Sequence, residues 1–387
     1  MGRETDSGIK LLTKITSIRW FGWGLGETFI PIFILLFSAN FFETGLLTSI
    51  YYVMFFLFIP ISGYLADKIK IKYILILGLS IYIFIGVGYF LAGFTGMIIF
   101  LILARMLNGI SYSLDQVGRE TYFVRHVSKK NESESFGRFD KITTFWWVLA
   151  VLVGILLINY VDIHWLLLAV TPTSIIALFL TLKLKEKPVK KTKQKIKNPY
   201  VKIFREVKNF NSNLKNLSVM VFFFSMMSSI VYYFAPAVSY FRGESMINSV
   251  ILVLAYSFPS LFGEKLGKFA DKIKVKGYYL SLISLIFVLI ILAFSPNYYL
   301  LLFSMFFAGM TFELTSLTNK GFMARNSAYN KVGEVDSVLN GIGSLGSIIG
   351  PIVFGFLLDL LNPMHSYFSA ILLVLVMFGF VYRMKDK

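Results

Sequence analysis

Twelve long apolar segments are the feature that most constrains how this chain can fold. Each holds about 20 residues, which as an α-helix is enough to cross about 30 Å of membrane hydrocarbon. Spanning β-strands would instead alternate in polarity over about 10 residues, and the continuous apolar run 73–92 does not. The segments lie near residues 17–39, 44–66, 73–92, 96–117, 139–160, 164–182, 214–240, 247–270, 277–295, 298–319, 333–360 and 366–383. The sequence predicts an all-α membrane protein with twelve transmembrane helices.

The composition agrees with this prediction. Hydrophobic residues make up 56% of the chain, which leaves too little polar surface for a soluble globule of this size. The chain has no cysteine and three scattered histidines, so we expect no metal site. It also contains neither a Walker loop nor an H-E-x-x-H pattern, so we expect no cofactor and no enzyme activity.

One pattern resembles a dinucleotide-binding fingerprint. Gly341-Ile-Gly343-Ser-Leu-Gly346 has the spacing G-x-G-x-x-G, but it lies in an apolar segment and does not follow a strand. This run continues to Gly350 and Pro351. We interpret its glycines as positions where a neighbouring helix packs closely, and Pro351 as a position where the helix can kink.

A ten-residue stretch at 63–72 returns at 267–276, with its core Ala-Asp-Lys-Ile-Lys-x-Lys unchanged. The second half of the chain therefore repeats the first. Six segments precede the lysine-rich middle and six follow it, and because six is even both halves enter the membrane from the same side. We predict two parallel six-helix bundles, 1–183 and 214–387, joined by a basic cytoplasmic linker at 184–213.

The positive charges predict the orientation. Apart from Arg105 and Arg242, the Lys and Arg residues lie at the termini, in the loops from even to odd segments, or at the adjoining segment ends. Both termini are therefore predicted to be cytoplasmic. The net charge of +17 is explained by this topology, and we expect no nucleic-acid partner. We expect a monomer that crosses the plasma membrane many times.

The linker can form an amphipathic helix that begins at Asn198-Pro199. Its apolar residues would lie opposite Lys202, Arg205 and Lys208. The apolar face would consist of Tyr200, Ile203, Phe204, Val207 and Phe210. We predict that this helix lies on anionic lipid headgroups; a site for nucleic acid or a regulatory protein is the alternative.

Together these features resemble the major facilitator superfamily. The loops between segments 2 and 3 and between 8 and 9 resemble its motif A, G-x-L-A-D-K-x-x-x-K. Ile71 stands where a glycine or arginine is common, and Phe269 replaces Leu65 in the second copy. The resemblance covers essentially the whole chain. It implies the major facilitator fold and secondary transport of a small solute by alternating access.

The repeated motif is our candidate for a cytoplasmic gate. Its glycines would let a helix end approach a neighbour closely. Its aspartates lie where hydrocarbon meets water, so each needs a partner: a following lysine or the N-terminal end of a helix from the other half. Alternatively, its lysines only satisfy topology. The candidate residues are Gly63, Asp67, Lys68, Lys72, Gly267, Asp271, Lys272 and Lys276.

Three intramembrane charges occur in one half only: Glu27, Arg105 and Glu313. A bare charge at mid-membrane costs about 2.5–3.5 kcal/mol on insertion scales, so we expect Glu27 and Arg105 to pair and face a polar cavity. Glu313 is a second cavity candidate; alternatively it pairs with a hydroxyl or with Lys320.

The sequence R-M-L-N-G from Arg105 resembles motif B, R-x-x-Q-G, which is common in proton-coupled members of the superfamily. Helical spacing places Arg105, Asn108, Tyr112 and Asp115 on one face. We hypothesise that Glu27 exchanges a proton and that Arg105 biases its protonation or holds the solute. The alternative is a static ion pair between segments 1 and 4.

The cavity wall is predicted to be aromatic, which suits an amphipathic or aromatic solute. Any one of these rings can instead face lipid or pack in the protein. The available residues are Trp20, Trp23, Tyr232, Tyr233, Tyr256 and Phe312.

We therefore predict a secondary active transporter for proton-coupled export of an amphipathic compound. The alternatives are a proton-coupled or facilitative importer of a sugar, amino acid or organic anion, and a non-transporting membrane sensor. Segment 5 has Gly154 without the following proline of the G-x-x-x-G-P motif of drug-proton antiporters, which weakens the drug-exporter reading. The candidate cavity residues are Glu27, Arg105, Asn108, Tyr112, Asp115, Tyr232, Tyr233 and Glu313.

Overall fold

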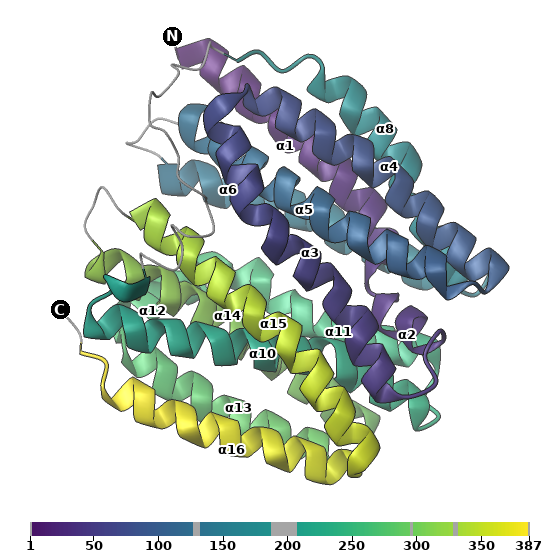
Figure 1. The fold of residues 1–387 in the computed structure, drawn as a ribbon, viewed down its shortest axis with the longest axis vertical. Coiled ribbons are helices and arrows are strands. Elements are labelled where there is room, and N and C mark those ends of the chain that lie inside the picture. The colour runs from purple at the N-terminus through teal and green to yellow at the C-terminus, as the bar shows by residue number, and fades with distance from the viewer. Residues whose placement is uncertain (1, 127–131, 187–206, 295–296, 328–331, 386–387) are drawn as a thin grey trace. The chain divides into compact units, whose positions relative to one another are not determined.

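The computed structural model describes residues 2–126, 132–186, 207–294, 297–327 and 332–385 (Figure 1). This described part is helical throughout its regular structure and contains no strand. The helices of the first half are α1 (Gly2–Glu27), α2 (Ile30–Leu35), α3 (Phe41–Lys68), α4 (Ile71–Thr95), α5 (Ile98–His126), α6 (Glu132–Leu157), α7 (Ile163–Leu168) and α8 (Val170–Thr181). Those of the second half are α10 (Ser212–Phe241), α11 (Met246–Ser257), η2 (Phe258–Phe262), α12 (Gly263–Ile273), α13 (Lys276–Phe294), α14 (Tyr298–Asn326), α15 (Val332–Leu360) and α16 (Pro363–Tyr382).

Eleven spans within the described residues are long and apolar enough to cross a membrane. Each overlaps one of the predicted segments from the second to the twelfth. The first predicted segment is occupied by α1 and α2, which are separated at Thr28 and Phe29. Pro31 lies in the first turn of α2, where its missing N–H is tolerated. The prediction of an all-α chain with twelve spans is therefore confirmed.

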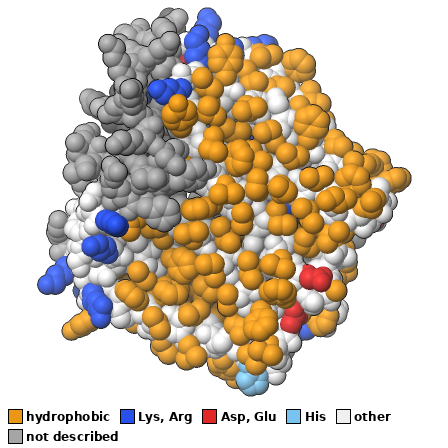
Figure 2. Space-filling view, in the orientation of Figure 1, with side chains coloured by type: hydrophobic (Ala, Val, Ile, Leu, Met, Phe, Trp, Pro, Cys, Tyr) orange, Lys and Arg blue, Asp and Glu red, His pale blue; other side chains and the backbone are white. Residues whose placement is uncertain are grey.

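The surface is apolar in the way that lipid contact requires. Large hydrophobic side chains such as Phe84, Phe179 and Leu372 are more than 60% exposed. Hydrophobic side chains also predominate on the face that Figure 2 shows. Exposed apolar area of this extent would be unfavourable in water, so the helices present these residues to hydrocarbon.

The contacts divide the chain into two units. The first comprises residues 1–33 and 50–199, and the second comprises 34–49 and 200–387. In the first unit α1 packs on α6 and α8, and α4 packs on α5 and α8. In the second, α10 packs on α15, and α13 packs on α14 and α16. The domain limits predicted from the linker stay a prediction.

Residues 34–49 belong to the second unit because the first turn of α3 binds α15. The backbone N–H groups of Phe41 and Phe42 donate to the two carboxylate oxygens of Asp359, at 3.0 and 2.7 Å. The first N–H groups of a helix have no partner within the helix, and a carboxylate there also interacts favourably with the helix dipole. Asp359 therefore caps α3 from a distant part of the sequence.

The duplication predicted from the repeated stretch is visible in the packing of two glycines. A Cβ atom on Gly109 of α5 would overlap the carbonyl oxygen of Tyr51 in α3. A Cβ atom on Gly309 of α14 would likewise overlap the carbonyl oxygen of Tyr256 in α11. In each half, a glycine in the fourth span thus brings that span into backbone contact with the second span.

The glycines of the candidate gate behave differently. A Cβ atom on Gly63 would have nothing within 4 Å, and one on Gly267 would meet only Leu317 Cδ2, at 4.0 Å. Within its own unit, neither glycine has a neighbour in close contact. The expected approach of a helix from the other half stays a prediction.

The G-x-G-x-x-G pattern lies inside α15, so its interpretation as helix packing is confirmed. Cβ atoms on Gly346 and Gly350 would press on the backbone oxygens of Phe222 and Met226 in α10. The helix continues through Pro351. Residues 198–206 of the predicted interfacial helix fall outside the described residues, so this helix stays a prediction.

The second copy of the repeated stretch contains a strained residue. Lys274, directly after α12, has φ +50° and ψ −129°, whereas its counterpart Lys70 has φ −62° and ψ 135°. A side chain disfavours positive φ because its Cβ crowds the backbone, and glycine does not.

We expect Lys274→Gly to stabilise the protein by up to about 1 kcal/mol, because the strain is released. Lys70→Gly should instead destabilise it by about 0.5–1 kcal/mol, since glycine loses more conformational entropy on folding. Thermal unfolding of the purified protein in detergent measures both. A Tm for Lys274→Gly at or below that of Lys70→Gly would contradict the expected backbone strain.

Candidate functional site

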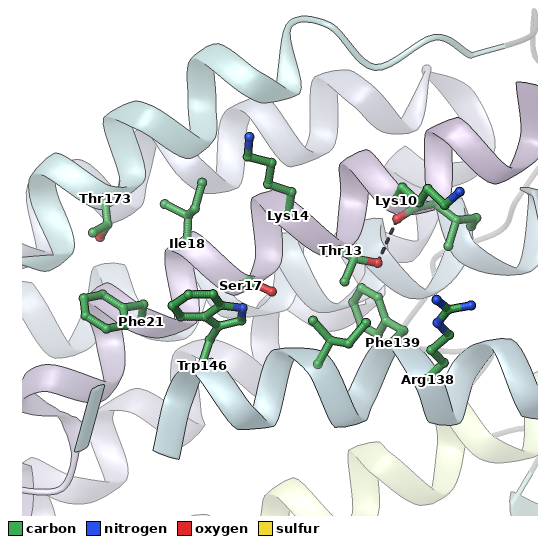
Figure 3. Close-up of a pocket in the computed structure, with 12 residues that line it drawn as sticks. Lys10, Thr13, Lys14, Ser17, Ile18, Phe21, Arg138, Phe139, Trp146 and Thr173 are labelled. Carbon is green, nitrogen blue, oxygen red and sulfur yellow. Dashed lines mark hydrogen bonds between the residues drawn. The ribbon is translucent and has the colours of Figure 1, made fainter. Parts of the chain in front are cut away.

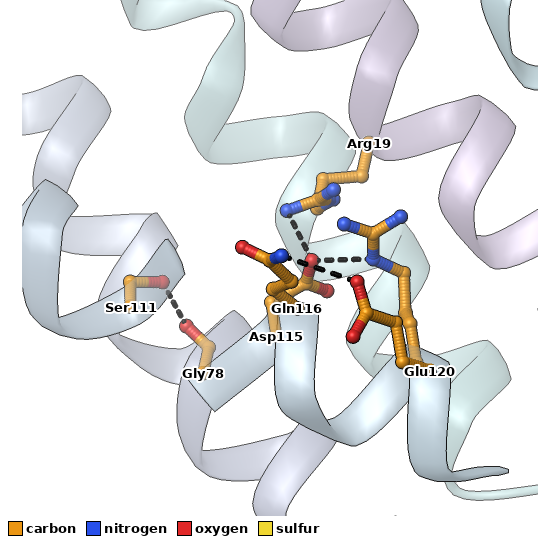
Figure 4. A network of polar contacts seen from close by, with 7 residues as sticks. Arg19, Gly78, Ser111, Asp115, Gln116 and Glu120 are labelled. Atoms are coloured by element: carbon orange, nitrogen blue, oxygen red, sulfur yellow. Dashed lines mark hydrogen bonds and ion pairs between the residues drawn. The ribbon is translucent and has the colours of Figure 1, made fainter. Parts of the chain in front are cut away.

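A buried charge cluster joins α1 and α5 in the first unit (Figure 4). Asp115 Oδ2 accepts from Arg19 Nη1 at 2.8 Å and from Arg119 Nε at 2.6 Å. The side chains of Arg19 and Asp115 are each 4% exposed. One carboxylate therefore serves two guanidinium groups, and Glu27 and Glu120 interact electrostatically with Arg19 and Arg119 respectively.

Aromatic rings and free donors surround this cluster. The Arg19 guanidinium lies 5.0 Å from the centre of the Tyr82 ring, and that of Arg119 lies 5.9 Å from the Trp20 ring. Among the described residues, Arg19 Nε and Trp20 Nε1 are buried without a hydrogen-bond partner. Both atoms are donors only, so the cluster can offer two N–H groups and positive charge to an acceptor.

Glu27 lies at the end of α1, next to tryptophan side chains. Its Oε2 accepts a hydrogen bond from Trp147 Nε1 at 2.7 Å, and Trp23 and Arg19 are further interacting neighbours. Arg105 is 1% exposed, and its guanidinium lies 5.1 Å from the ring of Tyr51 in α3. The described neighbours of the two residues differ, so the ion pair between Glu27 and Arg105 stays a prediction.

The other predicted residues of α5 follow the same helix. Tyr112 packs against Tyr51 with ring centres 6.0 Å apart, so it shares with Arg105 the face that helical spacing predicted. Asn108 and Asp115 are 2% and 3% exposed. Asp115 reaches α1 through Arg19.

The predicted aromatic residues of the second unit form one cluster. Ring centres of Tyr232 and Tyr256 are 5.5 Å apart, and those of Tyr256 and Phe312 are 5.7 Å apart. Tyr233 joins the cluster through Tyr232, at 5.1 Å. Glu313 lies beside it, interacting electrostatically with Tyr256.

Glu313 Oε1 also approaches α12. It lies 3.4 Å from the place that a Cβ atom on Gly263 would occupy. Lys320, one of the alternative partners of Glu313, interacts with Asp336. The partner that sequence reasoning proposed for Glu313 is thus close to a different carboxylate.

A polar pocket of about 230 Å³ lies between α10, α14 and α15 in the second unit. Among its lining residues, Asn340 Nδ2 donates to Asp336 Oδ2 at 3.3 Å. Asp336 precedes the membrane-spanning residues 338–360. Burial raises the pKa of the Asp336 carboxyl, against the opposing effects of Lys320 and Asn340.

The second copy of the gate motif has an arginine nearby in its own unit. Asp271 Oδ1 and Arg325 Nη1 lie 3.4 and 3.2 Å from the place that a Cβ atom on Gly321 would occupy. In the first unit the corresponding Arg125 donates from Nη2 to the carbonyl oxygen of Ala66, at 3.0 Å. The sequence reasoning missed both arginines, although they end the corresponding helices α5 and α14.

The gate lysines have varied surroundings. Lys68 lies 5.8 Å from the ring centre of Tyr64, and Lys72 Nζ donates to the carbonyl oxygen of Leu182. Lys272 and Lys276 are exposed. The side chain of Asp67 falls outside the described residues. Partners of the aspartates from the other half therefore stay a prediction.

Arg19 and Arg119 are the main site residues that sequence reasoning missed. Arg19 lies just inside the first predicted segment, where the cytoplasmic topology alone accounts for a basic residue. Arg119 follows Asp115 by four residues, a spacing at which helical side chains pair, and this signal could have identified it.

The family comparison and the structural comparison agree with each other. A family model described as Major Facilitator Superfamily matches residues 15–274 and 265–387. No curated protein matches the sequence. The structure is similar to the nucleoside transporter NupG, with a TM-score of 0.74 and 17% identity, over 98% of this chain and 100% of that one.

Two further solved structures are similar. One is a bacterial homologue of the human lysosomal transporter Spinster, with a TM-score of 0.74 and 16% identity, covering 97% of this chain and 95% of that one. The other is the human organic anion transporter MFSD10, with a TM-score of 0.70 and 14% identity, covering 96% and 99%. At these identities the likeness concerns the fold.

We expect Asp115→Asn to destabilise the protein by about 3–5 kcal/mol, because two buried guanidinium groups lose their shared carboxylate. Removing Arg119 as well, in Asp115→Asn/Arg119→Gln, should restore part of the loss. Thermal unfolding of the three proteins in detergent tests this. An Asp115→Asn protein as stable as the wild type would show that the cluster is not held by this carboxylate.

We expect Asp336→Asn to raise the Tm at neutral pH. The raised pKa means that the folded state binds the proton more readily than the unfolded state, so wild-type stability falls as the pH rises through the folded pKa. The advantage of the variant should vanish at a pH below the pKa of an unfolded aspartate. Asp140→Asn, at an exposed aspartate, is the control. A stability advantage of Asp336→Asn that grows on acidification would contradict this account.

Proposed function

The chain belongs to the Major Facilitator Superfamily and is a multi-pass membrane transporter, and we propose that it carries an amphipathic organic solute with a negatively charged group, coupled to protons. The family and the transporter neighbours indicate a transporter rather than an enzyme. The proposal follows from three features of its helices: excess buried positive charge, aromatic surfaces and a carboxylate at mid-span.

The observation that carries this proposal is the cluster of Arg19, Asp115 and Arg119. Two guanidinium groups share one carboxylate at 2.8 and 2.6 Å, so these three side chains together carry one positive charge. Glu27 beside Arg19 and the exposed Glu120 beside Arg119 are further carboxylates that interact with them. Excess charge at such a place is unfavourable unless a counter-ion balances it. A carboxylate, sulfonate or phosphate of the solute would supply that balance and would accept from Arg19 Nε.

The aromatic surfaces account for the rest of the solute. In the first unit Trp20 stacks under Arg119, and Trp23 lies 6.2 Å from Tyr82, measured between ring centres. The second unit has an aromatic cluster of its own around Tyr256. Apolar surface with a few placed polar groups is typical of sites for small organic molecules.

Glu27 is the proposed proton-exchanging group. It interacts with Arg19, so its protonation changes the negative charge that Arg19 experiences. When Glu27 is neutral, Arg19 is more available to a solute anion, and proton and anion binding reinforce each other. This sign of coupling favours co-transport, which corresponds to the import of an organic anion.

Proton-coupled export of an amphipathic compound is the second candidate. The aromatic rings within each unit favour it, because such rings would bind an apolar solute without help from its charge. Export requires the opposite sign of coupling, in which protonation of Glu27 releases the solute. Alternating access of two six-helix bundles serves either direction.

The charge preference can be tested by ligand-induced stabilisation. A ligand that binds the folded state raises its Tm, so an aromatic carboxylate and an aromatic sulfonate should stabilise the protein more than the matched neutral amide. The difference should be lost in Arg19→Gln and retained in Lys265→Gln, an exposed control. Equal stabilisation by the neutral amide would contradict the anionic solute.

Coupling requires a transport measurement in liposomes. We expect wild-type protein to accumulate the stabilising solute against its gradient when a pH gradient is applied. Accumulation should occur on the alkaline side for co-transport with protons and on the acidic side for exchange. Glu27→Gln should keep exchange of solute down its gradient but lose accumulation, whereas the exposed Glu264→Gln should retain both. If Glu27→Gln still accumulates solute against its gradient, Glu27 is not the coupling group.

A further inference from the structure

We propose that a groove on the first unit binds an anionic phospholipid, with its phosphate at Lys10, Lys14 and Arg138 and one acyl chain along α1 (Figure 3). The groove has a volume of about 660 Å³ and lies between α1, α6 and α8. Its α1 residues recur every three to four positions, so they form one stripe of that helix. This site is separate from the proposed solute site.

The two sites use opposite faces of α1. At 100° per residue, Arg19 lies about 180° around the helix from Lys10, and Lys14 and Phe21 lie on the Lys10 side. Arg19 binds Asp115 of α5, whereas Phe21 meets Trp146 of α6 with ring centres 6.2 Å apart. The groove therefore does not share its charged groups with the solute cluster.

Polarity changes along the groove in the same direction on both helices. Lys10 of α1 and Arg138 of α6 are exposed at one end, and the exposed Lys14 lies one turn farther along α1. Phe21 and Trp146 lie at the other end, as Figure 3 shows. Phe21 lies eleven positions after Lys10, which corresponds to about 16.5 Å of helix at a rise of about 1.5 Å per residue. A molecule that fills the groove needs an anionic end and an extended apolar part.

The deep end of the groove is closed by close packing. A Cβ atom on Gly22 would overlap the hydroxyl group of Thr173 in α8, so α1 and α8 touch there. Ser17 lines the groove between the two ends, and its hydroxyl has no hydrogen-bond partner among the described residues. It lies one turn deeper than Lys14 on α1, at the level where the ester groups of a lipid would follow the phosphate.

The groove opens toward lipid. Neighbouring side chains on α6 and α8 are large, apolar and exposed: Phe145 by 58%, Ile176 by 51% and Phe179 by 64%. Within the groove itself Ile142 and Trp146 are 37% and 41% exposed. Such residues contact acyl chains in a membrane, so the occupant most able to reach the groove is a lipid of the same leaflet.

The charges select among lipids. A zwitterionic lipid would bring its own cation to the three basic side chains, whereas an anionic phospholipid would complement them. A soluble phosphate would leave the apolar end unfilled. By the predicted topology this leaflet is cytoplasmic, where basic residues next to a membrane attract anionic lipids.

The test is a lipid titration followed by native mass spectrometry of the whole protein in detergent. We expect wild type to retain phosphatidylglycerol at least tenfold more tightly than phosphatidylcholine. Lys10→Gln/Lys14→Gln/Arg138→Gln should lose this preference, and Lys215→Gln/Lys265→Gln/Lys385→Gln, which removes three exposed charges elsewhere, should keep it. Equal retention of both lipids by wild type, or equal loss in both triple variants, would overturn the proposal.

A second measurement locates the acyl chain. Because the chain has no cysteine, Ile142→Cys offers a single attachment point for a spin label in the groove. The label should lose mobility when phosphatidylglycerol is added to phosphatidylcholine nanodiscs, and inorganic phosphate should have no such effect. Unchanged mobility with phosphatidylglycerol places the lipid elsewhere and refutes the groove, and an equal response to phosphate refutes the lipid.

Discussion

In hydrocarbon, every backbone N–H and C=O group needs a partner inside the protein, and the rest of this structure depends on that constraint. It makes each span a helix, so the helices can differ only in their side chains and in how closely they pack. Asp359 shows the constraint at a helix end, where its two oxygens take the N–H groups of Phe41 and Phe42. Buried charge obeys the same requirement, which is why the carboxylate of Asp115 binds both Arg19 and Arg119.

Much of the fold was predictable because its signals are local. Apolar length identified the spans, and the repeated stretch identified the duplication. The separation of α1 from α2 at Thr28 and Phe29 was not predicted, because the apolar pattern continues across it. Close helix approach occurs at Gly109 and Gly309, whereas a Cβ atom on Gly63 would have nothing within 4 Å, and a glycine alone does not reveal how far away its neighbour lies.

The candidate site was harder to predict, because it depends on which helix faces which. Tyr232, Tyr256 and Phe312 were recognised as available rings, and the structure brings them together. Arg19 was overlooked because its position near a span end resembles topological charge. Its role emerges only when α1 is placed against Asp115, and that contact joins residues 96 positions apart in the sequence (115 − 19).

The glycine contacts have a mechanical consequence. Where Gly109 meets the backbone of Tyr51, and Gly309 that of Tyr256, no side-chain layer separates the paired helices. Such a layer normally absorbs small shifts by changing rotamers, and here there is none to do so. We therefore expect α3 and α5 to move together as one rigid body, and α11 and α14 to do the same. When one helix of a pair is displaced, the other should move by the same amount.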